Sequence, residues 1–456
     1  MFRFYIAFYA AKLTRFLLKL LRRNASFFPG KVAVTICPDF LGKVSKPEKI
    51  IGVTGTNGKT TVFNLLIKSL EDNGYKVLDN RLGSNVNSGL ASAFILGTNL
   101  LNKTKYQIAV LEIDERSSPK VYPYVKPTYL ICTNLFRDSI RRNANPEFIS
   151  SLINKELPKE TKLILNADDL ISSSLGKENE KVYFSIDKLD TDLTESINII
   201  NDMRICPKCN TRLKYNYVRY HHIGNAYCPN CDFKSPKADY RVTKIDYENN
   251  KILVEHKNEE CEYKLISHSI FNIYNTVAII AILKELGLEK EKIQKNIEDA
   301  KIVESRYNKE EMKGINIISH MAKGQNPVAC SCVFDYIRKE KGPKEVILLI
   351  YDLHDSEESS ENITWLYDCD FEFLNSNNIE KIIIGGPRAE DFYLRLLIAG
   401  VPKDKLVFTN NTQDTTNYLS LEKNKDIYVL FDVYTDHIAK NVCEKIKEKI
   451  NQKYEK

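Results

Sequence analysis

Gly52-Val-Thr-Gly-Thr-Asn-Gly-Lys-Thr-Thr61 is the stretch of sequence that decides the fold of this protein. It lies between an apolar run at residues 49–53, typical of a strand, and a segment at residues 60–71 with helical periodicity. In a strand–loop–helix unit of this kind, backbone N–H groups of the loop can surround a phosphate group at the helix N-terminus. The stretch therefore predicts a phosphate loop that follows a strand of a parallel sheet.

Two side chains of this loop have predicted roles in nucleotide binding. Lys59 would reach the β- and γ-phosphates, and the hydroxyl group of Thr60 would ligate Mg²⁺. The general motif has glycine where Val53 stands, so its strict form is not met. The strand before the loop and the helix after it still favour a nucleotide site over a chance match.

An acidic segment, Leu111-Glu-Ile-Asp-Glu115, ends another apolar run. A carboxylate at the C-terminal end of a strand, close to a phosphate loop, is well placed to hold Mg²⁺. Acids at strand ends are also common as solvated loop residues, but the phosphate loop upstream favours a role in binding. The segment therefore predicts a carboxylate that holds Mg²⁺ together with Thr60.

Apolar runs alternate with helical or loop segments along the rest of the chain. The runs with strand character cover residues 108–113, 129–132, 163–165, 315–318, 346–350, 382–384 and 427–431. Helices are expected at residues 273–286 and at the C-terminal end, where Ile438, Val442, Ile446 and Ile450 lie on one face. This alternation predicts an α/β fold with parallel sheets and crossover helices.

A chain of 456 residues is too long for one hydrophobic core, and we expect three parts. Residues 1–45 are predicted to form an N-terminal amphipathic helical segment, residues 46–310 a central ATP-binding domain, and residues 311–456 a smaller Rossmann-like α/β domain. The hydrophobic share of 43% is that of an ordinary globular protein. The net charge of +6 is small for this length and argues against a nucleic-acid partner.

Four cysteines stand in two Cys-x-x-Cys pairs that are separated by eighteen residues. They are Cys206, Cys209, Cys228 and Cys231. Two such pairs supply four thiolates for a tetrahedral zinc site in a reducing compartment. Four protein ligands leave no position for substrate, so we predict a structural Zn²⁺ in a ribbon inserted at residues 203–237. His221 and His222 lie between the pairs and are expected beside the site, not as ligands.

The N-terminal segment Phe2–Leu21 is apolar but carries a basic stripe at helical spacing. The stripe consists of Lys12, Arg15, Lys19 and Arg22. The longest uncharged run, residues 4–11, is far short of the ~20 residues that span a bilayer, and no signal-peptide cleavage site follows it. Two interpretations stay open: a helix packed on its own domain, and a helix that lies on a membrane surface.

The loop Thr54–Thr61 resembles the ATP loop of the Mur ligases, a family that replaces the first glycine of the general motif. Further segments are similar to one branch of that family, the MurT type. They are Leu111-Glu-Ile-Asp-Glu115, Thr133-Asn-Leu-Phe-Arg-Asp138, Leu163-Ile-Leu-Asn-Ala-Asp-Asp169, Phe233-Lys-Ser-Pro236 at the end of the ribbon, Tyr274-Asn275, Thr364-Trp365, Asp368-Cys-Asp-Phe-Glu372 and Arg388-Ala389. The resemblance covers nearly the whole chain, and the ribbon inside a Mur ligase domain is its most specific part.

The resemblance implies an ATP-dependent carbon–nitrogen ligase that acts in cell-wall synthesis. ATP phosphorylates the α-carboxylate of the D-glutamate in the lipid II stem peptide, and ammonia then displaces phosphate to leave D-isoglutamine. The implied partner is a class I glutaminase subunit of the GatD type, which makes the ammonia from glutamine within a heterodimer. The implied cofactors are ATP, Mg²⁺ and structural Zn²⁺. The implied location is the cytoplasm, with peripheral contact at the inner face of the membrane.

The resemblance also implies roles for individual residues. Those of nucleotide binding fall on Gly55, Thr56, Asn57, Gly58, Lys59, Thr60, Thr61, Asn134, Asp138, Asn272, Asn275 and Arg306. Thr60 and Glu112 are the implied magnesium ligands. In the family, an aspartate of the ligase's C-terminal domain orients the catalytic histidine of the glutaminase, as the acid of any triad does. Asp352 and Asp355 are both candidates for that aspartate.

Three segments depart from the family pattern and surround the expected acceptor and partner site. They cover residues 139–145, 323–328 and 351–365. The departures leave two other classes of protein open: a Mur-type ligase that adds an amino acid, such as a polyglutamate synthase, and a nucleotide-binding scaffold without turnover. The zinc ribbon and the Thr364-Trp365 segment favour the amidating ligase over a polyglutamate synthase.

Overall fold

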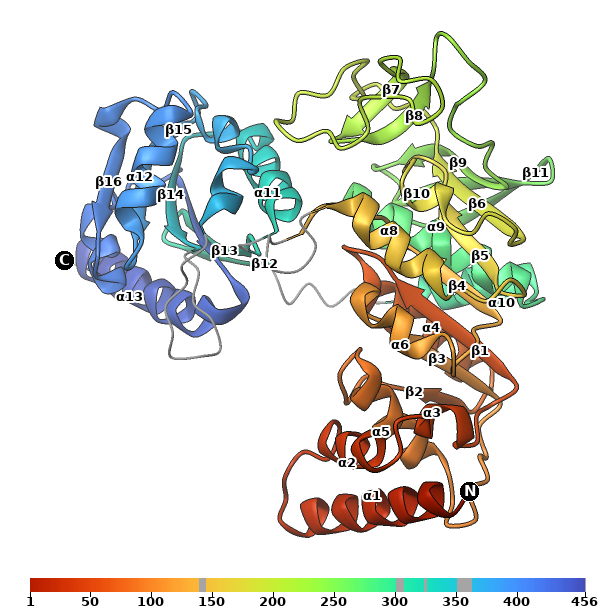
Figure 1. Ribbon diagram of the computed structural model, residues 1–456. Coiled ribbons are helices and arrows are strands. Elements are labelled where there is room, and N and C mark those ends of the chain that lie inside the picture. The colour runs from red at the N-terminus through yellow and green to blue at the C-terminus, as the bar shows by residue number, and fades with distance from the viewer. Residues whose placement is uncertain (139–144, 301–306, 324–325, 351–362, 456) are drawn as a thin grey trace. The chain divides into compact units, whose positions relative to one another are not determined.

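A computed structural model describes residues 1–138, 145–300, 307–323, 326–350 and 363–455 (Figure 1). Contacts within the chain divide it into two compact units. The first unit holds the described residues within 1–135, 145–196 and 202–302, and the second holds those within 136–144, 197–201 and 303–456. Each unit has its own sheet and its own hydrophobic core. The predicted domain boundaries at residues 45 and 310 stay predictions.

The first unit is built on a sheet whose strand order, in the described part of the chain, is β11-β10-β9-β6-β5-β4-β1-β3-β2. The strands are β1 (Lys49–Thr54), β2 (Val77–Asp79), β3 (Ile108–Glu112), β4 (Tyr129–Cys132), β5 (Lys162–Asn166), β6 (Lys181–Ile186), β9 (Tyr240–Asp246), β10 (Lys251–His256) and β11 (Glu259–Lys264). Neighbours from β2 through β9 in this order run parallel, which confirms the predicted parallel sheet.

An antiparallel extension, β9 to β11, continues this sheet and was not identified in the sequence. The reason is its exposure. In β11 the side chains from Glu259 to Lys264 are exposed or half-buried except Tyr263, so no continuous apolar run marks the strand. Antiparallel strands with one solvent-exposed face commonly lack such an apolar run, whereas parallel strands that are covered on both faces have one.

Helices cover both faces of the parallel part of the sheet. On one face α4 (Lys59–Asp72), α9 (Ile270–Glu285) and α10 (Lys290–Glu298) pack together. The opposite face carries α5 (Asn87–Gly97), α6 (Ser118–Val121) and α8 (Pro146–Lys155), whose apolar side chains share one core with alternate residues of β1, β3, β4 and β5. Burial on both sides explains why these central strands read as continuous apolar runs.

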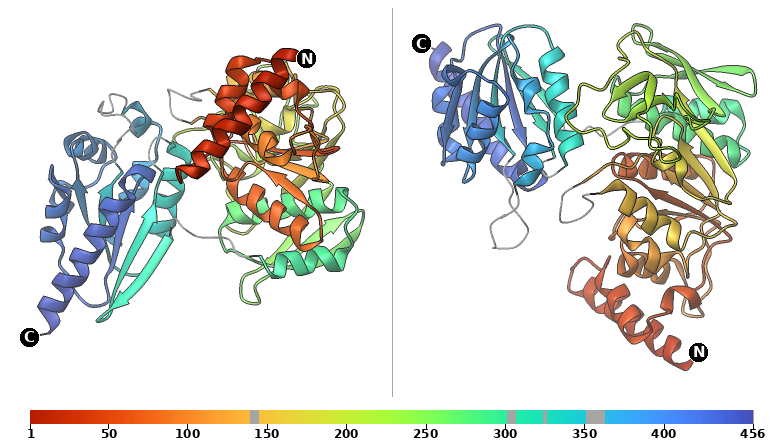
Figure 2. Two further views of the ribbon diagram at one scale, coloured as in Figure 1. Left: turned by 90° about the horizontal axis from the view of Figure 1, so that it is seen from below. Right: turned by 45° about the horizontal axis from the view of Figure 1, so that its top comes forward.

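Three N-terminal helices pack on the α5 side of the first unit. They are α1 (Phe2–Leu20), α2 (Phe28–Ile36) and α3 (Phe40–Lys43), and α1 lies on the outside of this group (Figure 2). Phe4 and Phe8 of α1 are fully buried, and the ring of Phe4 contacts that of Phe40 with 5.3 Å between the ring centroids. No helix among the described residues is both long enough and apolar enough to cross a bilayer.

The basic stripe predicted on α1 is broken by one of its members. The ammonium group of Lys12 donates hydrogen bonds to the carbonyl oxygens of Ile95, at 2.6 Å, and Thr98. These carbonyls lie at the C-terminal end of α5, where a cation is favoured by the helix dipole. Burial, and then the charge of Arg15, lower the pKa of Lys12 to about 8. Lys12 therefore anchors α1 to its own unit.

The segment between β6 and β9 forms a small hairpin of its own, β7 (Lys214–Tyr220) and β8 (Ile223–Tyr227). It lies inside the predicted ribbon. Leu170, Leu213 and Ala226 make a minor apolar cluster with the buried cysteines of the two pairs. With so little apolar burial, the ribbon needs other interactions to hold its shape.

The second unit is a smaller α/β layer with strand order β12-β13-β17-β14-β15-β16 in its described residues. Its elements are β12 (Tyr307–Met312), β13 (Ile315–Met321), α11 (Pro327–Lys339), β14 (Lys344–Leu349), β15 (Ile379–Gly385), α12 (Ala389–Ile398), β16 (Leu406–Thr409), β17 (Asp426–Phe431) and α13 (Asp436–Tyr454). All pairs are parallel except β12 with β13. The predicted strands at residues 315–318, 346–350, 382–384 and 427–431 are confirmed, and β12 and β16 are additional edge strands.

Candidate functional site

Three loops of the first unit meet at one edge of its sheet. The parallel strands β4, β1 and β3 are adjacent in that order. The phosphate loop follows β1, the acidic segment follows β3, and Thr133-Asn134 follows β4. Because the carboxyl ends of parallel strands lie at the same edge, these segments come together where α/β sheets usually bind ligands.

Two glycines give the phosphate loop its shape. Gly55 and Gly58 have φ values of +124° and +88°, in the region that residues with a Cβ atom rarely adopt. A Cβ atom on Gly58 would also lie only 2.4 Å from Oδ1 of Asn275 in α9. Gly58 caps α4, which begins at Lys59. The loop therefore ends at a helix N-terminus, where unpaired N–H groups and the helix dipole attract anions.

The loop is held from the β4 side by Thr133 and Asn134. The N–H groups of Thr56 and Asn57 donate to the carbonyl oxygen and to Oδ1 of Asn134, at 2.8 and 3.0 Å. In return, Thr133 Oγ1 and Asn134 Nδ2 donate to the carbonyl oxygen of Asn57, at 2.6 and 3.0 Å. Asn134, a predicted nucleotide contact, is buried and acts as a support of the loop.

The predicted phosphate-binding lysine is held by an acid. Nζ of Lys59 lies 2.8 Å from Oε1 of Glu115, and the N–H group of Gly55 donates to the same oxygen at 3.1 Å. Burial by itself lowers the pKa of Lys59, but Glu115, Glu112 and Asp114 outweigh it and raise the pKa above its ordinary value. Lys59 is therefore charged at neutral pH, and an incoming phosphate group would compete with Glu115 for it.

Glu115 belongs to the acidic segment, but no role was predicted for it from the sequence. The signal available in the sequence was the presence of three acids, Glu112, Asp114 and Glu115, in four residues, at a strand end expected beside a loop with one lysine. What the sequence could not tell is which of the three turns toward Lys59. The chain bends at Asp114, whose side chain accepts from the N–H group of Arg116, and this turn buries Glu115.

Glu112, the predicted magnesium ligand, ends β3 opposite Val53 of β1. Its backbone is fixed by Asn80: Oδ1 accepts from the Glu112 N–H group at 2.9 Å, and Nδ2 donates to the Glu112 carbonyl oxygen at 2.9 Å. The carboxylate accepts a long hydrogen bond, 3.4 Å, from Nδ2 of Asn85 and is half-buried. Mg²⁺ prefers oxygen ligands, which the Glu112 carboxylate and the hydroxyl group of Thr60 both supply, so the chemistry of these residues fits the ion.

The remaining predicted residues fall into four groups. Thr60 and Thr61 lie in the first turn of α4, and Thr60 is exposed. Asn272 and Asn275 lie in the first turns of α9, joined by a hydrogen bond of 3.2 Å from Asn275 Nδ2 to Asn272 Oδ1. Asp138 belongs to the second unit. Arg306, Asp352 and Asp355 lie outside the residues that the structure describes.

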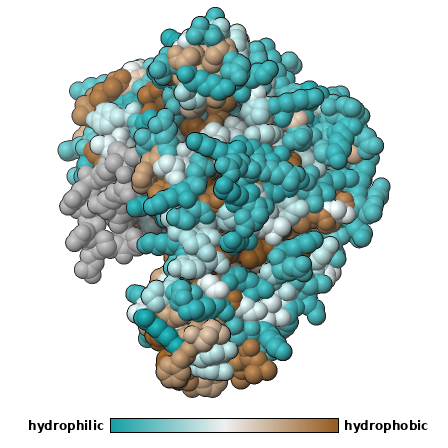
Figure 3. All heavy atoms as spheres, turned by 45° about the vertical axis from the view of Figure 1, so that its right-hand side comes forward, coloured by the Kyte–Doolittle hydropathy of each residue, from teal (hydrophilic) through white to brown (hydrophobic). Residues whose placement is uncertain are grey.

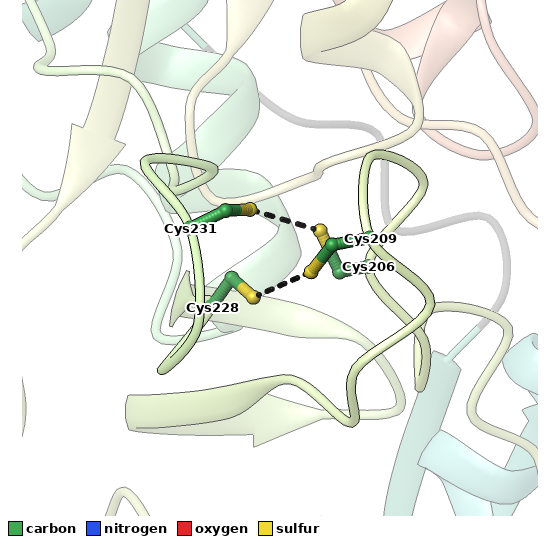
Figure 4. A group of neighbouring side chains, drawn as sticks. All are labelled: Cys206, Cys209, Cys228 and Cys231. Carbon is green, nitrogen blue, oxygen red and sulfur yellow. Dashed lines mark hydrogen bonds between the residues drawn. The ribbon is translucent and has the colours of Figure 1, made fainter.

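The four cysteines of the ribbon gather in one cluster (Figure 4). Their sulfur atoms all lie within 4.8 Å of one another. The Sγ atoms of Cys206 and Cys231 are 3.5 Å apart, and those of Cys209 and Cys228 are 3.4 Å apart. A tetrahedral ion with Zn–S bonds of ~2.3 Å would place the sulfurs about 3.8 Å apart. The cluster fits zinc, whereas a disulfide needs a separation of ~2.05 Å.

Backbone groups around the cluster suit thiolate ligands. The N–H groups of Lys208 and Asn230 donate to the sulfurs of Cys206 and Cys228, each at 3.4 Å. Each donor lies two residues after the cysteine that it serves, so the two Cys-x-x-Cys turns have the same local geometry. Such N–H groups offset part of the negative charge that four thiolates would carry.

His222 ties the ribbon to the rest of the first unit. It lies at the tip of the β7–β8 hairpin, and its Nε2 is 3.1 Å from Oδ1 of Asp169, with both side chains fully buried. An ionised carboxylate only accepts hydrogen bonds, so Nε2 is the donor. Oδ2 of Asp169 accepts from the N–H group of Leu135, the residue after Asn134, at 2.7 Å. The prediction that His221 and His222 are not ligands is consistent with this placement.

A second buried contact anchors the same hairpin. Arg219 of β7 pairs with Asp192 at 2.7 Å. The hydroxyl groups of Tyr217 and Tyr274 donate to Asp168, at 2.9 and 2.6 Å. Burial of charged groups is costly unless each is paired, so this network fixes one orientation of the hairpin on the sheet.

Comparison with known proteins shows which class of protein has this fold. A family model described as the Mur ligase middle domain matches residues 53–227, and one described as MurT ligase C-terminal matches residues 324–436. The solved pseudomurein peptide ligase type C from Methanothermus fervidus is 24% identical, with a TM-score of 0.65 over 89% of this chain and 80% of that chain. MurF from Thermotoga maritima is 15% identical, with a TM-score of 0.59 over 93% of this chain and 85% of that chain. The fold is that of a Mur-type ligase.

Curated relatives narrow the class. Subunit MurT of the glutamine-hydrolysing lipid II isoglutaminyl synthase of Staphylococcus aureus is 33% identical over 88% of this chain and 89% of the relative. The MurT subunit of Streptococcus pneumoniae is 29% identical over 92% of each chain. The chain therefore belongs to the MurT branch of the Mur ligase family. The predicted ATP-dependent ligase is confirmed at the level of this family.

The cysteine cluster leads to a prediction about metal. Purified protein should contain one zinc ion per chain, and X-ray absorption should show four sulfur ligands and no oxygen ligand. Cys206→Ser should lose the zinc and lower the melting temperature, because the ribbon has little apolar burial to replace the metal. Cys261→Ser, at a half-buried cysteine outside the cluster, is the matched control and should keep the zinc. Absence of stoichiometric zinc from the wild-type protein would refute the assignment.

The His222–Asp169 pair leads to a prediction about stability. His222→Ala should lower the melting temperature by about 3–10 °C, because the buried carboxylate of Asp169 loses one of its hydrogen-bond donors and the missing ring leaves a cavity. Zinc content should remain unchanged, since the group of side chains that could hold the metal consists of the four cysteines and does not include His222. His437→Ala, at an exposed position of α13, should leave the melting temperature within about 1 °C of the wild type. Loss of zinc from the His222 variant would show that the histidine is a metal ligand after all.

Proposed function

We propose that this protein is the ligase subunit that amidates the D-glutamate α-carboxylate of the lipid II stem peptide. The reaction uses ATP, and the ammonia comes from a glutaminase subunit. The observation that carries the proposal is the loop from Gly55 to Lys59, held between the acidic segment and Asn134 in a chain whose MurT relatives are named for this synthase.

The first step is phosphoryl transfer. A carboxylate oxygen of the acceptor forms a bond to the γ-phosphorus of ATP, the bond to the β,γ-bridging oxygen breaks, and ADP leaves an acyl phosphate. The N–H groups at the start of α4 and the ammonium group of Lys59 offset the negative charge on the transferred group. A bound Mg²⁺, held by Glu112 and Thr60, would supply further positive charge to the phosphates.

The ion pair between Lys59 and Glu115 holds Lys59 ready for the phosphoryl transfer. Lys59 is kept charged and close to the loop by Glu115 and by the carbonyl oxygen of Gly55. When a phosphate arrives, Nζ has only to exchange one oxygen partner for another, so little rearrangement is needed. Glu115 is therefore a positioning residue for Lys59 in this proposal.

The second step is amide formation. Ammonia attacks the carbonyl carbon of the acyl phosphate, the C–O bond to phosphate breaks, and the nitrogen loses one proton. Phosphate is a good leaving group, whereas the oxide of a free carboxylate is not, which is why ATP is needed. No cysteine of this sequence stands on a nucleophile elbow with a matching histidine, so the ammonia comes from solution or from the glutaminase subunit of the GatD type.

The proposed substrate also indicates where in the cell the protein acts. Lipid II is lipid-linked, and its stem peptide is amidated on the side of the membrane that holds ATP. The protein is therefore expected in the cytoplasm, at the inner face of the membrane.

Substitution of Lys59 tests the ATP site. Lys59→Ala should lower amidation by about 100-fold or more, because the charge is needed mainly in the transition state. The fold should stay intact, but the melting temperature should fall, because the buried carboxylate of Glu115 loses its ion partner. Glu112→Ala should lower activity in a way that raised Mg²⁺ partly restores. Lys68→Ala, at an exposed lysine of α4, is the control and should keep full activity.

The same assay tests the reaction class. Ammonium and a panel of amino acids are offered as nucleophiles with the stem peptide as acceptor. If ammonium is the only nucleophile that the protein accepts, the result supports the proposal. Ligation of an amino acid would favour the polyglutamate-synthase class. Hydrolysis of ATP that does not respond to the acceptor would favour a scaffold. Normal amidation by the Lys59 variant would contradict the phosphate-loop assignment.

Asp352 and Asp355 are the proposed residues that reach the glutaminase. Substitution of the true residue by Asn should cut glutamine-dependent amidation by about 10-fold or more and spare the reaction with free ammonium, because only the partner's histidine depends on that carboxylate. Each variant is assayed in the assembled complex with both nitrogen sources. Asp414→Asn, in a short 3-10 helix of the second unit, is the control. If both variants keep full glutamine-dependent activity, the shared triad is wrong for this protein.

A further inference from the structure

Helix α1 has two apolar faces, and only one of them is covered by protein. The covered face is formed by Phe4, Ala7, Phe8 and Ala11, which pack into the core of the first unit. The other face carries large apolar side chains at steps of three and four residues, which place them in one stripe. They are Phe2, Ile6, Tyr9, Leu13, Phe16 and Leu20. Phe2, Phe16 and Leu20 are 82%, 64% and 71% exposed.

The exposed stripe is part of a larger apolar surface. Leu100 and Leu101, in the turn after α5, are also exposed, and the hydroxyl group of Tyr9 donates to the carbonyl oxygen of Leu100. Figure 3 shows apolar side chains gathered at this end of the first unit, beside hydrophilic ones. Single exposed apolar residues need no explanation, but a contiguous stripe on one helix marks an interaction surface.

The charge of the protein is concentrated beside this surface. The first 38 residues hold seven Lys and Arg and no Asp or Glu, and the rest of the chain holds 59 basic and 60 acidic residues. The whole net charge of +6 therefore stems from the N-terminal helices and the turn between them. Lys19, Arg22, Arg23 and Lys31 are exposed. Lys19 flanks the stripe beside Leu20, since one residue along a helix is a rotation of about 100°, and Arg22 and Arg23 follow the C-terminal end of α1.

We propose that the stripe formed by Phe2, Ile6, Tyr9, Leu13, Phe16 and Leu20 docks on the surface of a bilayer that contains anionic lipids. In this position α1 lies parallel to the membrane plane, with the stripe among the acyl chains and the basic side chains at the headgroups. A helix with an apolar face, aromatic residues and flanking Lys and Arg binds interfaces in this way. This inference deepens the proposed function, because it gives a ligase for a lipid-linked substrate a surface by which to reach it.

Two contacts fix α1 as a rigid platform, which a membrane surface needs and a mobile tail would not supply. Lys12 is bound to the carbonyl oxygens of Ile95 and Thr98, and Arg3 donates to the carbonyl oxygen of Ile36. The N-terminal end and the middle of the helix are thus tied to the first unit through residues that lie outside the stripe. A rigid platform loses little conformational entropy when it docks.

The test uses full-length protein and vesicles without ATP, glutamine or lipid II. Binding is measured to vesicles of phosphatidylcholine and to vesicles of phosphatidylcholine with phosphatidylglycerol. The apolar variant combines Leu13→Gln, Phe16→Gln and Leu20→Gln, and the basic variant combines Lys19→Gln, Arg22→Gln and Arg23→Gln. The control variant combines Leu394→Gln, Ile398→Gln and Val433→Gln, at apolar positions that are about equally exposed in the second unit. All these side chains are exposed or half-buried, so the melting temperatures should stay close to the wild type.

The two variants should fail in different ways. The apolar variant should lose binding to both kinds of vesicle by at least about tenfold, because the buried apolar area falls. The basic variant should lose only the preference for the anionic vesicles, and added salt should have the same effect on the wild type. The control variant should bind as the wild type does.

Other results would overturn the inference. Wild-type protein that does not bind either vesicle, or an apolar variant that binds as well as the wild type, would exclude membrane docking. An apolar variant that changes the oligomeric state or the capture of the glutaminase, but not vesicle binding, would assign the stripe to a second copy or to that partner. Because the vesicle assay involves no turnover, it can succeed even if the proposed amidation fails. The apolar variant should amidate a water-soluble stem-peptide acceptor at the wild-type rate.

Discussion

The hydrogen bonds between the phosphate loop and Asn134 are the constraint on which the rest of the site depends. A loop that offers its N–H groups to a phosphate is under-bonded without one, and buried N–H groups that lack a partner destabilise the fold. Asn134 takes the N–H groups of Thr56 and Asn57, while Glu115 takes that of Gly55. The loop can therefore keep its shape before nucleotide binds, and the N–H groups at the start of α4 remain for the ligand.

The same support continues into the ribbon. The residue after Asn134 donates its N–H group to Asp169, and Asp169 accepts from His222 at the tip of the β7–β8 hairpin. The position of the phosphate loop is thus linked through two side chains to a small module with little apolar core. A metal held by the four cysteines would make that module rigid without a larger core. The ribbon is best understood as a brace for the β4 and β5 loops, because its four ligands leave no position for chemistry.

Charge is also distributed unevenly over the chain, with the net positive charge at the N-terminal end of the first unit. Its N-terminal helices carry the positive charge and the exposed apolar stripe, whereas the rest of the chain is nearly neutral. Net charge on this scale does not determine a fold, but its concentration next to an apolar surface determines what that surface can approach. The loops at the sheet edge and the exposed stripe of α1 thus lie on separate elements of the same unit.

The sequence by itself determined the parallel sheets, the phosphate loop, the four-cysteine cluster and the family. These depend on local patterns: continuous apolar runs, glycines at φ values that other residues avoid, and cysteines two apart. Three things were decided only by the tertiary structure. Glu115, not another acid of its segment, meets Lys59, because a turn at Asp114 directs it inward. Lys12 leaves the basic stripe because the C-terminal carbonyls of α5 lie within its reach. The apolar stripe of α1 stays uncovered because Phe4 and Phe8 already fill the space against α2 and α3. Each depends on contacts between residues distant in sequence, and a pattern in the sequence gives the chemistry of a side chain but not the neighbour that it meets.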